Sequence, residues 1–191
     1  MGTGVVQVRH LLPRRVSAVL SARRQRTRCG ARVRRSGPRD LDALLELEHR
    51  VFATDRLSRR SLRHLLHAPT AEVLVAEADG RFAGTAIVLF RAGSKLARLY
   101  SVAVAPHMGG RGIASLLLDA AEDRARARKC RAIRLEVHET NHRAISRYHK
   151  SGYREFGRHP AYYEDGGDAL RFEKPIATKT PGPRVRNPSS K

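Results

Sequence analysis

The chain has 191 residues, 41% of them hydrophobic, and its 38 Lys and Arg against 18 Asp and Glu give a formal charge of +20. The length predicts one domain with tails, and the hydrophobic content excludes a chain that is disordered throughout. No apolar run approaches the roughly 18 residues of a membrane-spanning helix. Two cysteines are too few for a disulfide framework or a cysteine-built zinc site. We therefore expect a soluble, cytoplasmic, basic domain that does not contact a membrane through a spanning segment.

Both ends of the chain are basic and free of acid. Residues 1–30 hold seven arginines, and residues 175–191 hold four Lys or Arg among Pro, Gly and Ser. The C-terminal tail is predicted to be disordered, because this composition cannot offset the entropy of ordering. The N-terminal arm has three interpretations: a solvated extension, an organellar targeting segment, or a segment that contacts RNA or a membrane surface. We favour the solvated extension, with contact to RNA or the ribosome next.

Residues 31–174 are predicted to form the folded domain, in which short apolar segments alternate with turn residues. Strands are predicted at 31–35, 72–78, 81–90, 97–105, 131–138, 153–157 and 169–174. Helices are predicted after Asp40 to Val51, from Ser58 or Ser61 to Leu66, and at 111–129 and 141–151. This order, β-α-α-β-β-β-α-β-α-β-β, predicts a mixed α/β domain.

Three local signals support these elements. Asp40 is a good helix cap, Asp79-Gly80 is a typical two-residue hairpin turn, and Gly152 suits the left-handed end of a helix. The run Leu99–Val104 carries no charge, which favours a central strand covered on both faces.

A strand, a glycine turn and a helix follow one another over residues 104–114, VAPHMGGRGIA. Such a turn points backbone N–H groups at one spot, where the helix N-terminus adds partial positive charge, so the segment favours phosphate binding. A tight structural connection is the alternative. The turn lacks the Lys-Ser/Thr ending of a Walker loop, which disfavours hydrolysis of a nucleoside triphosphate. It also lacks the glycine spacing G-x-G-x-x-G, which disfavours a dinucleotide-binding fold.

With this turn the chain resembles the GNAT family of N-acetyltransferases, whose signature is R/Q-x-x-G-x-G/A between the fourth strand and a long helix. Here the signature falls on Gly109-Gly110-Arg111-Gly112-Ile113-Ala114, and Gly109 stands where the family has Arg or Gln. The resemblance covers about residues 31–174. It implies a central, mostly antiparallel mixed sheet flanked by helices, with splayed fourth and fifth strands.

The resemblance also implies acetyl-CoA as the acetyl donor. The loop amides would bind its pyrophosphate, the fourth strand would pair with its pantetheine arm, and an asparagine would hydrogen-bond the coenzyme. The residues so implied are Val102, Ala103, Val104, Gly109, Gly110, Arg111, Gly112, Ile113, Ala114 and Asn141. Without an Arg or Gln at 109, we expect weakened rather than lost pyrophosphate binding.

A second block, residues 136–153, is similar to the ribosomal-protein alanine N-acetyltransferase branch, as is Tyr162-Tyr163-Glu164-Asp165-Gly166 before the last strand. In that branch a glutamate on the fifth strand is the general base and a tyrosine twelve residues later the general acid. The resemblance places these roles on Glu136 and Tyr148.

The residues themselves leave alternatives open at these positions. Alternation sets Glu136 off the apolar face of its strand, either as a base at a cleft or as a solvated carboxylate paired with an arginine. Tyr148 shares the inward helix face of Ala144 and Ile145, where a tyrosine usually packs with its hydroxyl bonded. Asn141 is more often a helix cap, and Glu164 and Asp165 either line the amine pocket or form a turn.

Other chemistries are disfavoured. Cys130 has no placed base, so a nucleophilic cysteine is not expected. The pairs His64/His67 and His138/His142 lack a third ligand nearby, so we predict no metal site and interpret them as surface residues on basic faces.

The sequence therefore predicts an acetyl-CoA-dependent N-acetyltransferase acting by direct transfer, with a protein N-terminal α-amine as acceptor. Lysine, polyamine or antibiotic amines are alternative acceptors, because this fold hosts many. A basic module that binds acetyl-CoA and RNA or the ribosome without turnover is the alternative of another class.

Overall fold

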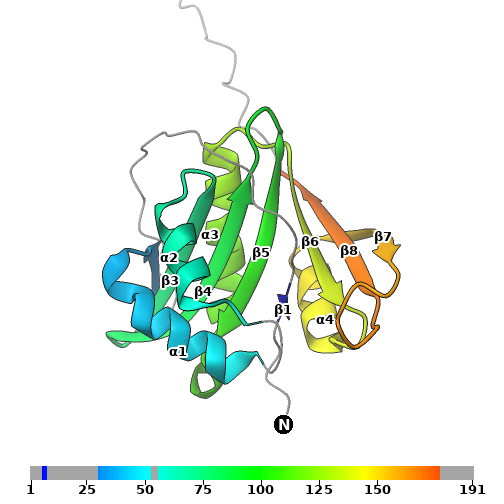
Figure 1. The fold of residues 1–191 in the computed structure, drawn as a ribbon. Coiled ribbons are helices and arrows are strands. Elements are labelled where there is room, and N and C mark those ends of the chain that lie inside the picture. Colours follow the sequence, from blue (N-terminus) through cyan, green and yellow to red (C-terminus); the bar gives the residue numbers. More distant parts are fainter. Residues whose placement is uncertain (1–5, 8–29, 53–55, 177–191) are drawn as a thin grey trace, which may run out of the picture.

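The computed structural model describes residues 6–7, 30–52 and 56–176 (Figure 1). Most of the predicted basic arm and tail therefore lies outside the described residues. The strands are β1 (Val6–Gln7), β2 (Arg32–Arg35), β3 (Ala71–Ala78), β4 (Arg81–Phe90), β5 (Leu96–Val104), β6 (Ala132–His138), β7 (Arg154–His159) and β8 (Ala169–Pro175). The helices are α1 (Leu41–Val51), α2 (Arg59–His67), α3 (Ile113–Ala127) and α4 (His142–Lys150), with 3-10 turns η1 (Pro38–Asp40) and η2 (Pro106–Met108).

The strands form one mixed sheet in the order β2-β3-β4-β5-β6-β8-β7. All neighbours in this order are antiparallel except β5 and β6, which run parallel. The parallel pairing spans only three residue pairs, from Leu96↔Ala132 to Arg98↔Arg134, and beyond them the two strands separate (Figure 1). The predicted mixed α/β fold with splayed central strands is confirmed.

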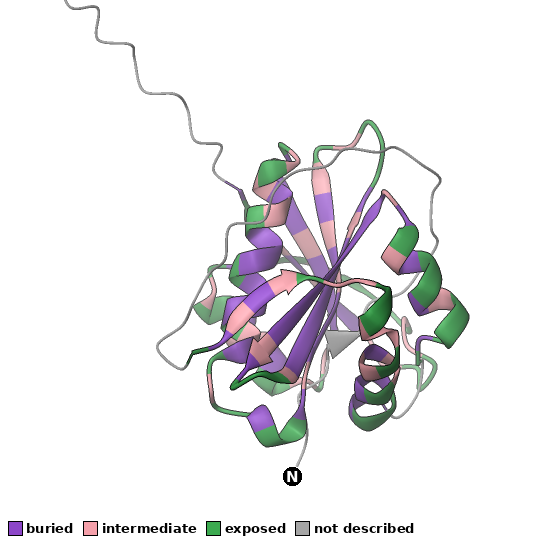
Figure 2. Ribbon diagram, turned by 90° about the vertical axis from the view of Figure 1, so that its left-hand side faces the viewer, coloured by how far each residue is buried: buried purple, intermediate pink, exposed green. Residues whose placement is uncertain are grey.

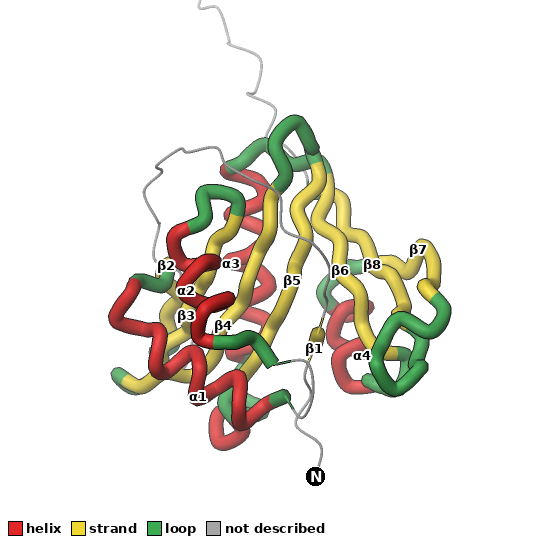
Figure 3. The backbone as a smooth tube through the Cα atoms, viewed as in Figure 1, coloured by secondary structure: helices red, strands yellow, loops and turns green. Residues whose placement is uncertain are grey.

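Helices cover both faces of the larger half of the sheet. Helices α1 and α2 lie on one face of β3, β4 and β5, and α3 lies on the other (Figure 3). Strands β3, β4 and β5 are therefore largely buried (Figure 2), whereas β7 at the other edge of the sheet is mostly exposed. None of the helices in the described ranges is both long and apolar enough to cross a membrane.

The predicted turns explain most element boundaries. Asp79 and Gly80 have φ of 51° and 72°, as a tight hairpin turn requires, and Gly152 has φ of 84° after α4. Helix α3 is shorter than predicted because left-handed backbone at Gly112 and Lys129 flanks it, with φ of 76° and 58°.

Asp40 is the N-cap residue of α1, as the sequence predicts, but its side chain makes no capping hydrogen bond. Its carboxylate instead accepts hydrogen bonds from Arg34, Ser36 and the backbone N–H of Gly37. A nearby arginine and backbone donors compete for the same oxygens, and they lower the pKa of Asp40 to about 2. The residue therefore fixes η1 against β2 rather than the start of α1.

Strand β1 was not predicted. It pairs antiparallel with β5, with Val6 opposite Val102 and Gln7 opposite Ser101. Figure 1 shows it in the gap where β5 and β6 separate. The chain thus places a short backbone segment against the free edge of β5.

Candidate active site

A glycine turn joins β5 to α3 and forms one wall of a pocket. Gly110 and Gly112 have φ of 79° and 76°, a left-handed backbone that glycine adopts without a Cβ penalty. The first N–H groups of any α-helix lack an intrahelical partner. Gly112 is the N-cap of α3 and has no side chain, so it does not cap these groups. This wall offers the backbone donors and the helix dipole that an anion requires.

Strand β5 forms the floor of this pocket through Val102 and Val104. An irregularity in the β4–β5 register leaves Tyr100 as an extra residue, because Val88 pairs with Leu99 and Ile87 with Ser101. One inserted residue reverses which side chains face which side of a sheet. As a result Val102 and Val104 line this first pocket, whereas Arg98, earlier on the same strand, lines a second one.

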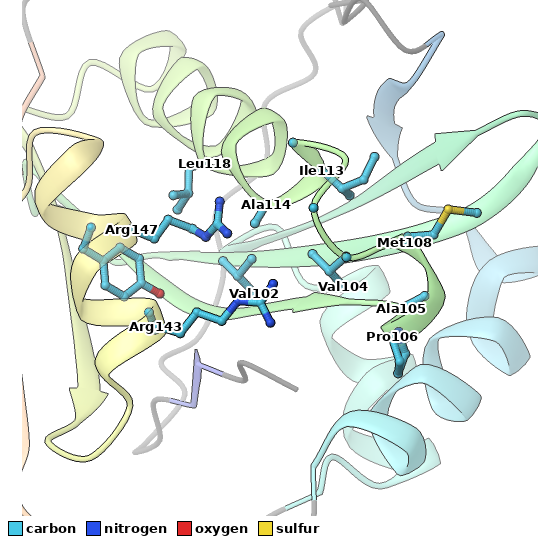
Figure 4. Close-up of a pocket in the computed structure, with 15 residues that line it drawn as sticks. Val102, Val104, Ala105, Pro106, Met108, Ile113, Ala114, Leu118, Arg143 and Arg147 are labelled. Atoms are coloured by element: carbon cyan, nitrogen blue, oxygen red, sulfur yellow. The ribbon is translucent and has the colours of Figure 1, made fainter. Parts of the chain in front are cut away.

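Helix α4 forms the wall opposite the glycine turn. Ala144 and Tyr148 line the pocket, and Arg143 and Arg147 extend into it from the same helix (Figure 4). Tyr148 is 1% exposed, and its hydroxyl has no hydrogen-bond partner in the part of the chain that the structure describes. Burial, reinforced by Tyr163, raises the pKa of Tyr148 well above its ordinary value. The phenol therefore keeps its proton, and no group among the described residues forms a hydrogen bond with its hydroxyl.

Most residues predicted for the cofactor meet at this pocket: Val102, Val104, Gly109, Gly110, Gly112, Ile113 and Ala114 line it. Three predicted residues do not line it. Ala103 is buried with its side chain away from the pocket, a consequence of strand alternation. The Arg111 guanidinium bonds to Asp79 Oδ2 at 2.6 Å and to the sulfur of Met108. The Asn141 side chain accepts a hydrogen bond from Ala144 N at 3.1 Å, which is the capping role that the sequence also allowed.

A second pocket contains Glu136 and lies where β5 and β6 begin to separate. Glu136 is 7% exposed. Its Oε2 accepts a hydrogen bond from Arg98 Nε at 3.1 Å, and Arg98 Nη2 donates to the Tyr162 hydroxyl at 3.1 Å. The carboxylate is thus paired with an arginine, as one interpretation of the sequence had it, but it is buried and not solvated. The sequence predicted no role for Arg98, and it indicated Tyr162 only as part of the similarity, because no local pattern links positions 98, 136 and 162.

The loop between β7 and β8 lies beside this second pocket. His138 bonds to Asp165 through Nε2, and its ring lies tilted against that of Tyr163, with 4.7 Å between the ring centroids, so its neighbours include an acidic side chain that the sequence did not predict. Burial, followed by Tyr162 and Glu136, raises the pKa of Tyr163 above its ordinary value. Tyr163 therefore lies near enough to Glu136 and Tyr148 for their electrostatic interactions to contribute to these shifts, although it lines neither pocket.

Other candidate chemistries find little support. Cys130 is buried, and burial raises the pKa of its thiol, which opposes thiolate formation. Within the described ranges, no group of three or more His, Cys, Asp or Glu side chains could hold a metal ion.

The structure combines a splayed mixed sheet, a glycine turn before a long helix, and a buried carboxylate beyond that helix. Comparison with known proteins identifies the class of protein that has this combination. The profile of the Acetyltransferase (GNAT) family matches residues 39–153, and the chain belongs to this family of acyltransferase enzymes.

Individual relatives agree with this assignment. An uncharacterised N-acetyltransferase of Methanocaldococcus jannaschii is 34% identical over 143 residues, which cover 74% of this chain and 90% of the relative. The candidate ribosomal-protein-bS18-alanine N-acetyltransferase of Bacillus subtilis is 30% identical over 141 residues, 73% of this chain and 92% of the relative. The crystal structure of the ribosomal-protein-S18-alanine N-acetyltransferase of Escherichia coli has a TM-score of 0.70 at 24% identity and covers 82% of this chain and 99% of that chain.

Proposed function

We propose that this acyltransferase moves an acetyl group from acetyl-CoA to the N-terminal α-amine of a protein by direct transfer. The observation that supports this most is the pair of pockets beside the separating strands β5 and β6. One pocket joins the glycine turn before α3 to a buried phenol that has no partner in the described part of the chain, and the other holds a buried carboxylate.

The residues of the first pocket fit acetyl-CoA. The glycine turn and the start of α3 offer backbone N–H groups for its pyrophosphate, and Val102 and Val104 offer an apolar floor for its pantetheine arm. The Tyr148 hydroxyl, which has no hydrogen-bond partner among the described residues, is a polar group in the wall that α4 forms. When bound, the coenzyme would supply the acetyl group as a thioester.

In this proposal Glu136 takes the proton that the amine loses as its nitrogen bonds to the acetyl carbon. Arg98 holds the carboxylate in place from the neighbouring strand. Tyr148 gives its proton to the sulfur as the carbon–sulfur bond breaks, which its buried, protonated phenol allows. General acid and base groups of this kind contribute roughly 10²–10⁴-fold each.

Two arguments favour an N-terminal α-amine as acceptor. An α-amine has an ordinary pKa of about 7.7–8.0 against about 10.4 for lysine, so less work is needed to make it neutral. In addition, the names of the Bacillus subtilis relative and of the Escherichia coli structure describe alanine N-acetyltransferases of a ribosomal protein.

To test this proposal, the full chain is incubated with acetyl-CoA and a panel of acceptors. The panel contains peptides with free N-termini, lysine peptides with blocked N-termini, polyamines and aminoglycosides. Mass spectrometry reports which amine gains 42 Da, the mass of an acetyl group less one hydrogen. Acetylation of free N-termini supports the proposal. Acetylation confined to lysine or to small amines would keep the transfer chemistry and overturn the acceptor.

Contact with RNA or the ribosome stays a prediction from the basic ends, which lie outside the described residues. Salt-sensitive RNA binding that disappears when residues 177–191 or 1–29 are removed would support it. The cytoplasmic location likewise stays a prediction.

A further inference from the structure

We propose that Arg143 and Arg147 of α4 provide the cationic side of the pyrophosphate site, with Arg143 acting where Gly109 supplies no side chain. This inference rests on the proposed use of acetyl-CoA. The glycine signature at residues 109–114 does not include these two arginines, and the similarity that implied Glu136 and Tyr148 as catalytic residues gave the arginines no role.

The glycine turn has no cationic side chain of its own in the pocket. Gly109, Gly110 and Gly112 contribute backbone alone, and the Arg111 guanidinium is bonded to Asp79 and to Met108. The turn therefore supplies N–H donors but no full positive charge. A pyrophosphate bound there would need its countercharge from another element.

Helix α4 places that charge at the turn. An Nη atom of Arg143 lies 3.9 Å from the point that a Cβ on Gly109 would occupy. Arg147 lies one helical turn further on and donates from Nη1 to Ser115 Oγ, in the first turn of α3, at 3.3 Å. Figure 4 shows both side chains extending from α4 across the pocket. Two segments that are about 30 residues apart in the chain thus supply one anion site.

This arrangement is unfavourable without an anion. Like charges four residues apart on a helix repel each other, and a cation beside a helix N-terminus faces the positive end of the dipole. Neither arginine forms an ion pair with an acid among the residues that the structure describes. A bound pyrophosphate would offset both penalties, because its negative charge attracts the two guanidinium groups and the helix N-terminus. Its oxygens would also accept bidentate hydrogen bonds from the guanidinium groups.

The test measures binding of acetyl-CoA to the full chain by isothermal titration calorimetry, without turnover. Arg143→Ala should weaken binding about tenfold, Arg147→Ala somewhat less, and the double variant more than either, because a hydrogen bond to a charged group contributes strongly. Arg63→Ala, an exposed helical arginine on α2, removes the same charge away from the pocket and is the matched control.

A rescue variant tests the place of the charge. Gly109 has φ of −59° and ψ of 147°, which any residue adopts, so Gly109→Arg needs no left-handed backbone. Its Cβ would lie 3.3 Å from the Pro106 carbonyl oxygen, so the turn must shift by a few tenths of an ångström to accept it. In the Arg143→Ala background it should restore most of the lost affinity. A charge on the turn then replaces a charge on α4.

Two coenzyme fragments identify the phosphate concerned. The loss caused by Arg143→Ala should persist with 3′-dephospho-acetyl-CoA and vanish with S-acetylpantetheine, which has no phosphate. Equal losses for all three ligands, a loss confined to the ligand with the 3′-phosphate, or no difference from Arg63→Ala would overturn the inference. Failure of the unchanged protein to bind acetyl-CoA would instead overturn the proposed function.

Discussion

The two pockets beside β5 and β6 are built in different ways. The first consists mainly of one continuous segment, residues 102–114, whose backbone forms the turn, together with α4. The second depends on side chains from three separate parts of the chain, in which Arg98 joins Glu136 to Tyr162. A backbone site tolerates many side-chain changes, whereas a site of three interacting side chains loses its geometry when one is replaced.

The two pockets should therefore respond differently to mutation. We expect changes in the second pocket to affect the rate and leave coenzyme affinity intact. We expect changes in the first pocket to affect affinity, except at Tyr148, whose hydroxyl has a chemical role. Variants in the two pockets should therefore separate an effect on rate from an effect on affinity.

Glu136→Gln should lower kcat about 100-fold or more, because the amide cannot accept the proton of the amine. The Kd for acetyl-CoA should stay within about twofold, since Glu136 lies outside the first pocket. Steady-state kinetics and calorimetry check the two values. Glu72→Gln is the matched control, because Glu72 is also a buried strand carboxylate held by arginines, Arg124 and Arg128, and it lines neither pocket. A fully active Glu136→Gln variant would remove the base from the mechanism.

Tyr148→Phe should lower kcat about tenfold to hundredfold and leave stability unchanged, because the hydroxyl has no partner to lose in the described part of the chain. Thermal unfolding and single-turnover rates check both statements. Tyr153→Phe is the control: its ring packs edge-on against Tyr148 at 5.6 Å between centroids, but it does not line the pocket. Equal rates for the two variants would contradict the acid role.

The raised pKa of Tyr148 makes a further, pH-dependent prediction. Burial disfavours the phenolate, so the proton-carrying form persists beyond the ordinary phenol pKa of about 10. The single-turnover rate of the unchanged enzyme should therefore show no fall attributable to Tyr148 up to about pH 10. A decline near pH 9 that is absent in Tyr148→Phe would show that the phenol ionises earlier than its burial implies.

Arg98→Met should lower kcat about tenfold, because the Glu136 carboxylate loses its positioning donor and Tyr162 loses its link to β5. In the Glu136→Gln background the same change should have almost no further effect, as a residue that acts through another requires. Arg32→Met, which removes an arginine paired with Glu77 at the far edge of the sheet, is the control. Additive effects of the Arg98 and Glu136 variants would show that Arg98 acts independently.

The smallest effect concerns β1. Because β1 pairs with β5 at Val102 and Ser101, it uses the strand edge that the pantetheine arm is proposed to use. Replacing Val6 and Gln7 by proline removes two backbone donors and should tighten acetyl-CoA binding about twofold to threefold. Gln7→Ala keeps the backbone N–H and should have no effect. Weaker binding in the proline variant would mean that β1 supports the site instead of competing for it.

Much of the fold was predictable because its signals are local. Asp79-Gly80, Gly152 and the glycines at 110 and 112 need particular backbone angles, and these needs can be seen in a few neighbouring residues. Asp40 occupies the predicted N-cap position, but the partner of its carboxylate was not predictable locally, because Arg34 lies on β2.

By itself, the sequence determined the order of elements, the glycine turn and the twelve-residue spacing from Glu136 to Tyr148, since periodicity and turn chemistry act over short stretches. The tertiary structure alone decided which side chains meet. The extra residue at Tyr100 reverses the faces of β5, and so sends Arg98 to Glu136, 38 residues away, and Val102 to the opposite pocket. The position of α4 across the pocket from the turn likewise brings the Arg143 guanidinium near Gly109. Strand register and helix packing depend on contacts across the whole domain, and no local pattern in a single chain encodes them.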